Sequence, residues 1–139
     1  MTQQRIPEIA KIGFIRSAQL PRDIMLQSMA GLVVGVAAEI TWLPFVGEAV
    51  LSWEGTVLNG GRQEKSTLKF STHALIPDDR RIAFVVRCAS GLEYLIGTRE
   101  GRRPVITYAE TTGKRTGDRA ARTYTITHVA QKSVLLCAL

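Results

Sequence analysis

The residues of this chain that could carry catalysis or hold a metal are few and scattered. The two histidines, His73 and His128, each follow a strand-like run, and Asp78 and Asp79 are the acids nearest the first of them. A zinc site needs three or four ligands, so this set is too small to predict one. A nucleophilic site would need Ser or Cys with His and an acid at a strained turn, and the sequence has no Gly-x-Ser-x-Gly. We therefore predict a protein that is not an enzyme and that has no metal or other cofactor.

Two basic loops are the stronger candidates for a binding function. Residues 113–119 read Gly-Lys-Arg-Thr-Gly-Asp-Arg, but a phosphate-binding loop needs Gly, four residues and then Gly-Lys-Ser/Thr at the start of a helix. The other loop spans residues 97–103. If both loops lie at the same end of the domain they form one positive rim, and the alternative is that each is an exposed, solvated loop. The cations predicted to contact an anion or a partner are Arg99, Arg102, Arg103, Lys114, Arg115, Arg119 and Arg122.

The net positive charge lies entirely in the second part of the chain. Residues 1–78 hold 7 Lys/Arg and 7 Asp/Glu, whereas residues 79–139 hold 11 and 5, which is the whole excess of +6. Such a charge suits phosphates or an acidic protein, or it serves solubility alone. A single-stranded nucleic acid would also need aromatic side chains on which its bases stack. Tyr94, Tyr108 and Tyr124 are the candidates, but their positions within strands favour packing in the core.

Residues 30–50 have nearly the length of a membrane span, but Glu39, Pro44 and three glycines interrupt them. A charge at the bilayer centre costs on the order of 3 kcal/mol, so we predict two buried strands joined at Pro44 and no contact with a membrane. Residues 1–29 mix charged and apolar side chains, so we expect no signal peptide. The two cysteines, Cys88 and Cys137, either form one disulfide between neighbouring strands or are buried thiols. Two buried, reduced thiols are the simpler prediction, and this state indicates a reducing compartment.

The elements that would position these residues are short strands. β-Branched and aromatic runs bounded by Gly, Pro and Asp predict an all-β fold, either an antiparallel β-sandwich or a closed β-barrel. At 139 residues the chain is most simply a single β-domain over residues 31–139, preceded by an irregular N-terminal arm over residues 1–30. In that arm, residues 11–16 allow a short strand and residues 22–30 a short helix. Strands are predicted at residues 32–40, 48–58, 63–71, 81–87, 92–96, 104–108, 122–128 and 132–139, with hairpin turns at 59–61 and 88–91.

The succession of these strands also resembles a known group of proteins. The runs Ser66–His73, Ile82–Arg87, Tyr94–Thr98, Pro104–Thr107 and Tyr124–His128 are similar to small β-proteins encoded among the tail and neck genes of bacteriophages and prophages of the Bacteroidetes type. The likeness covers residues 60–139 and rests on pattern. It implies a virion structural part, assembled in the bacterial host cytoplasm, that forms a homo-oligomeric ring and contacts other tail or neck proteins. No functional residue is carried over from it.

Two functional hypotheses follow from the sequence. The first is a virion structural protein of a phage tail or neck that acts by self-assembly. The alternative is a small β-barrel module that binds nucleic acid through its basic loops at residues 97–103 and 113–122. The first predicts a stable oligomer, and the second predicts binding that falls steeply with salt.

Overall fold

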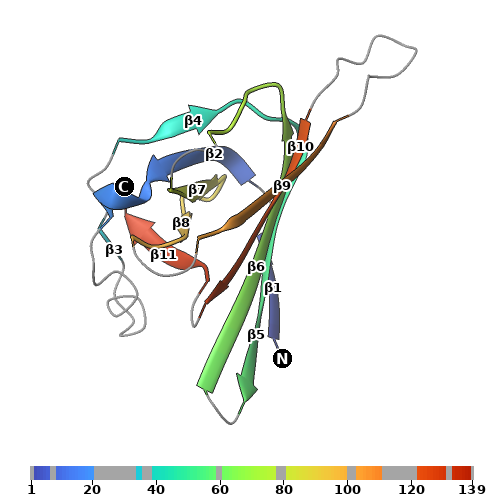
Figure 1. Ribbon diagram of the computed structural model, residues 1–139. Coiled ribbons are helices and arrows are strands. Elements are labelled where there is room, and N and C mark those ends of the chain that lie inside the picture. Colours follow the sequence, from blue (N-terminus) through green and yellow to red (C-terminus); the bar gives the residue numbers. More distant parts are fainter. Residues whose placement is uncertain are drawn as a thin grey trace.

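The computed structural model describes residues 2–6, 9–20, 34–35, 39–58, 61–77, 81–99, 103–110, 122–130 and 133–138. In these ranges the chain is a sandwich of two sheets, which confirms the predicted all-β class (Figure 1). The five-stranded sheet has the order β1-β5-β6-β10-β9, and the six-stranded sheet has the order β3-β11-β8-β7-β2-β4. The strands are β1 (Thr2–Ile6), β2 (Ile9–Arg16), β3 (Val34–Gly35), β4 (Thr41–Leu43), β5 (Val46–Leu58), β6 (Gly61–Thr72), β7 (Ile82–Cys88), β8 (Glu93–Ile96), β9 (Val105–Glu110), β10 (Arg122–Ala130) and β11 (Leu135–Ala138), with one 3-10 turn, η1 (Ser17–Gln19).

The N-terminal residues differ from the irregular arm that the sequence predicts. β1 pairs antiparallel with β5, and β2 lies between β7 and β4, so each sheet contains one strand from the first sixteen residues. The short strand predicted at residues 11–16 is confirmed, since these residues lie within β2, and Gly13 is one of them. A Cβ atom there would come within 2.9 Å of the Trp42 ring, so glycine permits this close packing. The short helix predicted at residues 22–30 lies outside the described residues.

Of the apolar stretch at residues 30–50, the structure describes residues 34–35 and 39–50. β3 covers Val34 and Gly35, whereas Glu39 is exposed and lies outside any strand. Pro44 stands between β4 and β5, as predicted, and its carbonyl accepts a hydrogen bond from the Thr72 hydroxyl. In the described residues no helix is both long enough and apolar enough to cross a membrane.

The core lies between the two sheets, and β7 is covered on both of its faces, as the sequence predicts. Its Phe84 packs with Phe70 and Tyr124 of the five-stranded sheet, while Val85 belongs to a second apolar cluster with Leu95. The described strands pair antiparallel, except for β3 and β11, which run parallel. The predicted turn at residues 88–91 is present, with Gly91 at φ +94° and its N–H donating to the Cys88 carbonyl at 3.0 Å.

A buried carboxylate ties the two sheets together. Glu64 on β6 is 9% exposed, and its Oε1 accepts hydrogen bonds from the backbone N–H groups of Ser133 at 2.9 Å and Val134 at 3.1 Å. The Ser133 hydroxyl also donates to this oxygen, at 3.3 Å. Ser133 and Val134 lie on the connection from β10 in one sheet to β11 in the other, so Glu64 holds that crossing in place.

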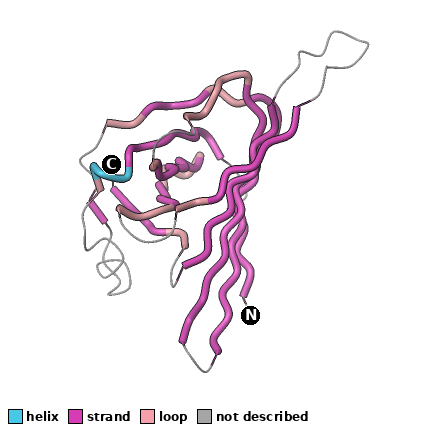
Figure 2. Tube along the Cα trace, viewed as in Figure 1, coloured by secondary structure: helices cyan, strands magenta, loops and turns pink. Residues whose placement is uncertain are grey.

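The hairpin of β5 and β6 extends beyond the rest of the sandwich. β5 has 13 residues and β6 has 12, but β1 pairs with β5 only as far as Gly55, and β10 pairs with β6 only as far as Glu64. The remaining residues, 56–58 and 61–63, form a two-stranded projection that we call the hairpin tip (Figure 2). A hairpin of two strands without a covering layer is marginally stable by itself.

Candidate interaction surfaces

The first surface is the open edge formed by β9. β10 is the only strand among the described residues that pairs with β9. Five of its six residues are exposed, and the exposed fractions of Val105 and Tyr108 are 60% and 59%. Proteins usually protect such edges with lysine, proline or a bulge, and β9 has none of these. Among the described residues no strand pairs with its outward N–H and C=O groups, which can therefore accept another strand.

Arg122 holds the far end of this edge. It is opposite Glu110 in the β9–β10 ladder, and its Nε donates to the Glu110 carboxylate at 2.6 Å. Its NH1 donates to the Tyr124 hydroxyl at 3.2 Å, and its guanidinium carbon lies 4.1 Å from the centre of the Tyr108 ring. The hydrogen bonds to Tyr124 and Glu110 raise the pKa of Arg122 above its ordinary value. The side chain thus stays charged and is engaged within its own subunit.

The three tyrosines divide between core and surface. Tyr124 is buried, with its ring 5.9 Å from Phe70 and its hydroxyl accepting the Ile76 N–H at 3.3 Å. Tyr94 is half-buried beside Trp53. Core packing is therefore the correct interpretation for these two, whereas Tyr108 lies on the surface because β9 is the edge strand.

The described basic residues do not gather into one rim. Arg103 lies two residues before the first residue of β9, and Arg122 is paired with its last residue, so roughly 20 Å of strand separates them. Residues that precede and follow one strand lie at its opposite ends, which explains the separation. Arg99 is half-exposed and its NH1 donates to the Leu20 carbonyl at 3.5 Å. Arg102, Lys114, Arg115 and Arg119 lie outside the described residues.

The five-stranded sheet has its second edge at β1, and the two edges are offset along the strands. When the residue pairings are followed across all five strands, a residue of β9 and a residue of β1 fall in the same row at only two positions. From there β9 continues toward one end of the sheet and β1 toward the other. The shared levels are Arg5–Ser52–Thr67–Thr127–Val105 and Ile6–Leu51–Leu68–Ile126–Ile106. The centres of the two edge strands are therefore displaced by three to four residues, or roughly 12 Å.

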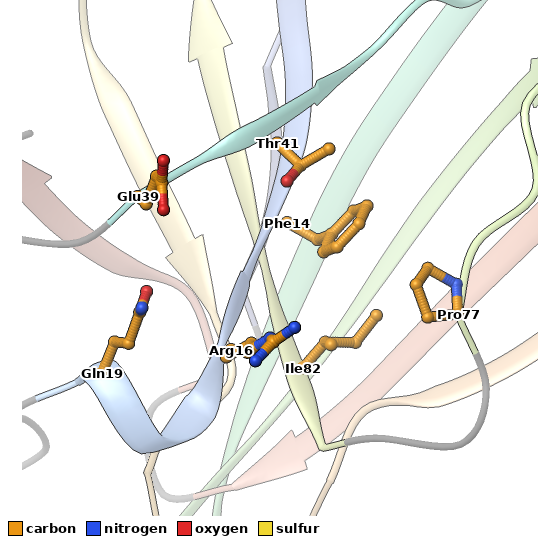
Figure 3. A pocket seen from close by; sticks show the side chains of 7 residues that line it. All are labelled: Phe14, Arg16, Gln19, Glu39, Thr41, Pro77 and Ile82. Carbon is orange, nitrogen blue, oxygen red and sulfur yellow. The ribbon is translucent and has the colours of Figure 1, made fainter.

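A cavity of about 540 Å³ (Figure 3) is lined by residues of β2 and β4, which lie at the end of the sandwich opposite the hairpin tip (Figure 1). Its apolar wall is made by Phe14, Ile82 and Pro77, and the last of these lies on the connection that leaves β6. Polar side chains from β2, η1 and the start of β4 complete it: Arg16, Gln19, Glu39 and Thr41. It combines an apolar surface with one carboxylate and one guanidinium.

The described histidine and cysteine side chains show no shared site. His73 is exposed and His128 is buried, and the described residues contain no group of three His, Cys, Asp or Glu side chains that could hold a metal. Cys88 is a buried thiol outside any disulfide, and burial raises its pKa. The Cys137 side chain lies outside the described residues.

The hairpin tip and the cavity are the surfaces that sequence reasoning missed. The sequence does contain a feature that indicates the hairpin tip: the strands on both sides of residues 59–61 are longer than the usual five to six residues. No sequence feature indicates the cavity, because its wall joins segments that are far apart in the chain. Phe14 and Ile82, for example, are 68 residues apart. No protein-family model, curated protein or solved structure matches this chain.

Proposed function

We propose that this protein is a virion structural component of a phage tail or neck that acts by self-assembly and by contacts with neighbouring tail proteins. The pattern of residues 60–139 supports the phage assignment. The observation that carries self-assembly is the open β9 edge, which exposes apolar side chains and unprotected backbone groups. Adding a strand satisfies such groups and covers the side chains at the same time.

The oligomer we propose is a ring joined through the two edges of the five-stranded sheet. Counting along the sheet order, β1 and β9 run in the same direction, so β9 of one copy would pair parallel with β1 of the next. Each copy contributes a width of roughly 24 Å, from five strands about 4.8 Å apart. An offset of roughly 12 Å over that width corresponds to strands tilted by roughly 25–30°. Closing a sheet requires its strands to tilt, by roughly 35–45° in typical barrels, so the proposed ring is tilted less than they are.

The edge can be tested by placing charge on it. We expect the double variant Val105→Lys, Thr107→Lys to weaken self-association roughly tenfold or more, because lysines on an edge strand oppose pairing. Thr67→Lys is the matched control, since Thr67 is on the same face of the sheet but two strands inward. Sedimentation velocity and negative-stain electron microscopy would measure the oligomer.

Two results would count against this function. If the unmodified protein stays monomeric at high concentration, the assembly role is wrong. If the edge variant assembles as well as the control, another surface makes the contact. Salt-sensitive binding of an oligonucleotide that is lost on changing Arg99 and Arg103 would favour the nucleic-acid alternative.

A further inference from the structure

We infer that the hairpin tip of one copy docks into the end cavity of a second copy, so that copies also join in line along the strand direction. The inference rests on the proposed function, because it adds a second contact between the same subunits. It differs from the edge contact in both its surfaces and its direction.

The tip presents an apolar and a positively charged side chain on one face. Val57 is directly opposite Arg62 in the hairpin, and directly opposite residues in an antiparallel ladder share a face. Because side chains alternate, this is the face that carries Leu51 and Trp53 into the core. Val57 lies past the end of that core and is 79% exposed. A partner that covers it would bury an apolar side chain and support a hairpin that has only two strands here.

The cavity lies at the opposite end of the same molecule. β6 runs from Gly61 in the hairpin tip to Thr72, a length of roughly 37 Å, and Pro77 of the cavity wall follows a few residues later. Figure 1 shows the β5–β6 hairpin at one end and β2 and β4 at the other. A contact between opposite ends of identical subunits is head-to-tail, and it repeats as an open filament unless the rotation between copies closes it into a ring.

The chemistry of the two surfaces is complementary. The apolar wall of Phe14 and Ile82 offers contact to Val57, and the exposed Glu39 carboxylate offers a partner for the Arg62 guanidinium. Arg16 places a positive charge on β2, whereas Glu39 lies just before β4, so Arg62 must approach from the Glu39 side (Figure 3). The inward-facing side of the tip thus meets the inward-facing side of the six-stranded sheet.

A disulfide trap tests the contact directly. We expect the variant Val57→Cys, Thr41→Cys to give a ladder of covalently linked oligomers on mild oxidation, because Thr41 lines the cavity and is exposed. Each single variant adds one exposed thiol and should give at most a linked dimer and no ladder, because Cys88 is buried. Absence of a ladder in a preparation that does self-associate would overturn the docking while leaving the edge-mediated assembly in place.

A charge exchange tests its orientation. We expect Arg62→Glu and Glu39→Lys each to weaken in-line association roughly fivefold, and the double variant to restore it. Lys65→Glu is the control, because Lys65 lies on the opposite face of the same strand. Sedimentation velocity would measure association, and thermal melting would confirm that each variant is folded. If the double variant stays as weak as the single variants, or if Lys65→Glu acts like Arg62→Glu, the proposed docking is wrong.

Discussion

Replacing Glu64 by alanine should destabilise this protein more than any surface substitution on the same hairpin. The carboxylate oxygen accepts two backbone N–H groups, from Ser133 and Val134, which are 0% and 4% exposed. Each N–H left without an acceptor in such a place costs roughly 1–3 kcal/mol. Allowing for partial access of water to the vacated space, we expect a loss of about 3 kcal/mol in the free energy of unfolding, a large share of a typical total of roughly 5–15 kcal/mol.

Two further variants separate the hydrogen bonds from the charge. Glu64→Gln keeps an oxygen acceptor and should cost about 1 kcal/mol, because hydrogen bonds to a charged acceptor are stronger than neutral ones. Glu54→Gln is the matched control on the neighbouring strand, where Glu54 is half-exposed opposite Lys65, and it should stay within about 0.5 kcal/mol of the unmodified protein.

Urea unfolding followed by tryptophan fluorescence would give these values, since Trp42 and Trp53 are both half-buried. The slope against urea should stay constant while the midpoint falls. Dilute protein should be used, so that self-association does not add to the apparent stability. A loss for Glu64→Ala below about 1 kcal/mol would refute the role assigned to the carboxylate, because it would lie within the range of ordinary surface changes.

Two other predictions concern packing and pH. Gly13→Ala should cost roughly 1–3 kcal/mol, because its Cβ would lie 2.9 Å from the Trp42 ring, whereas Gly55→Ala, with no described atom within 4 Å, should be close to neutral in the same urea unfolding experiment. Burial raises the pKa of Cys88 and of Tyr94 above their ordinary values of 9.0 and 10.0, so the native state keeps protons that the unfolded state releases. Stability should therefore be complete below pH 9 and fall as the pH rises from there. Urea midpoints measured between pH 7 and 10 would test this. We expect Cys88→Ala to make the midpoint fall less steeply with pH. A midpoint that does not change with pH in the unmodified protein would contradict the prediction.

Much of the sandwich follows from local pattern. The alternation of Leu68 and Phe70 with Lys69 predicts a half-exposed strand, and both apolar residues are indeed buried. The apolar run at Ile82–Val86 predicts a strand covered on both faces, as found for β7. Gly91 predicts a turn because only glycine readily adopts a positive φ. These features depend on neighbours in the chain, and the sequence displays them directly.

The choice of edge strands, the offset of β1 and β9, and the joining of Phe14 and Ile82 into one cavity were decided only by the tertiary structure. The order in which strands pair depends on contacts between distant segments, which leave no periodic trace in the sequence. The same holds for β1, which falls in the arm predicted to be irregular and becomes a strand because β5 supplies its hydrogen bonds, whereas the strand predicted at residues 11–16 lies within β2. The sequence by itself determined that this chain forms β-strands and where most of them turn. The tertiary structure determined which strands stay open to a partner, because an edge is defined by the neighbour that a strand lacks.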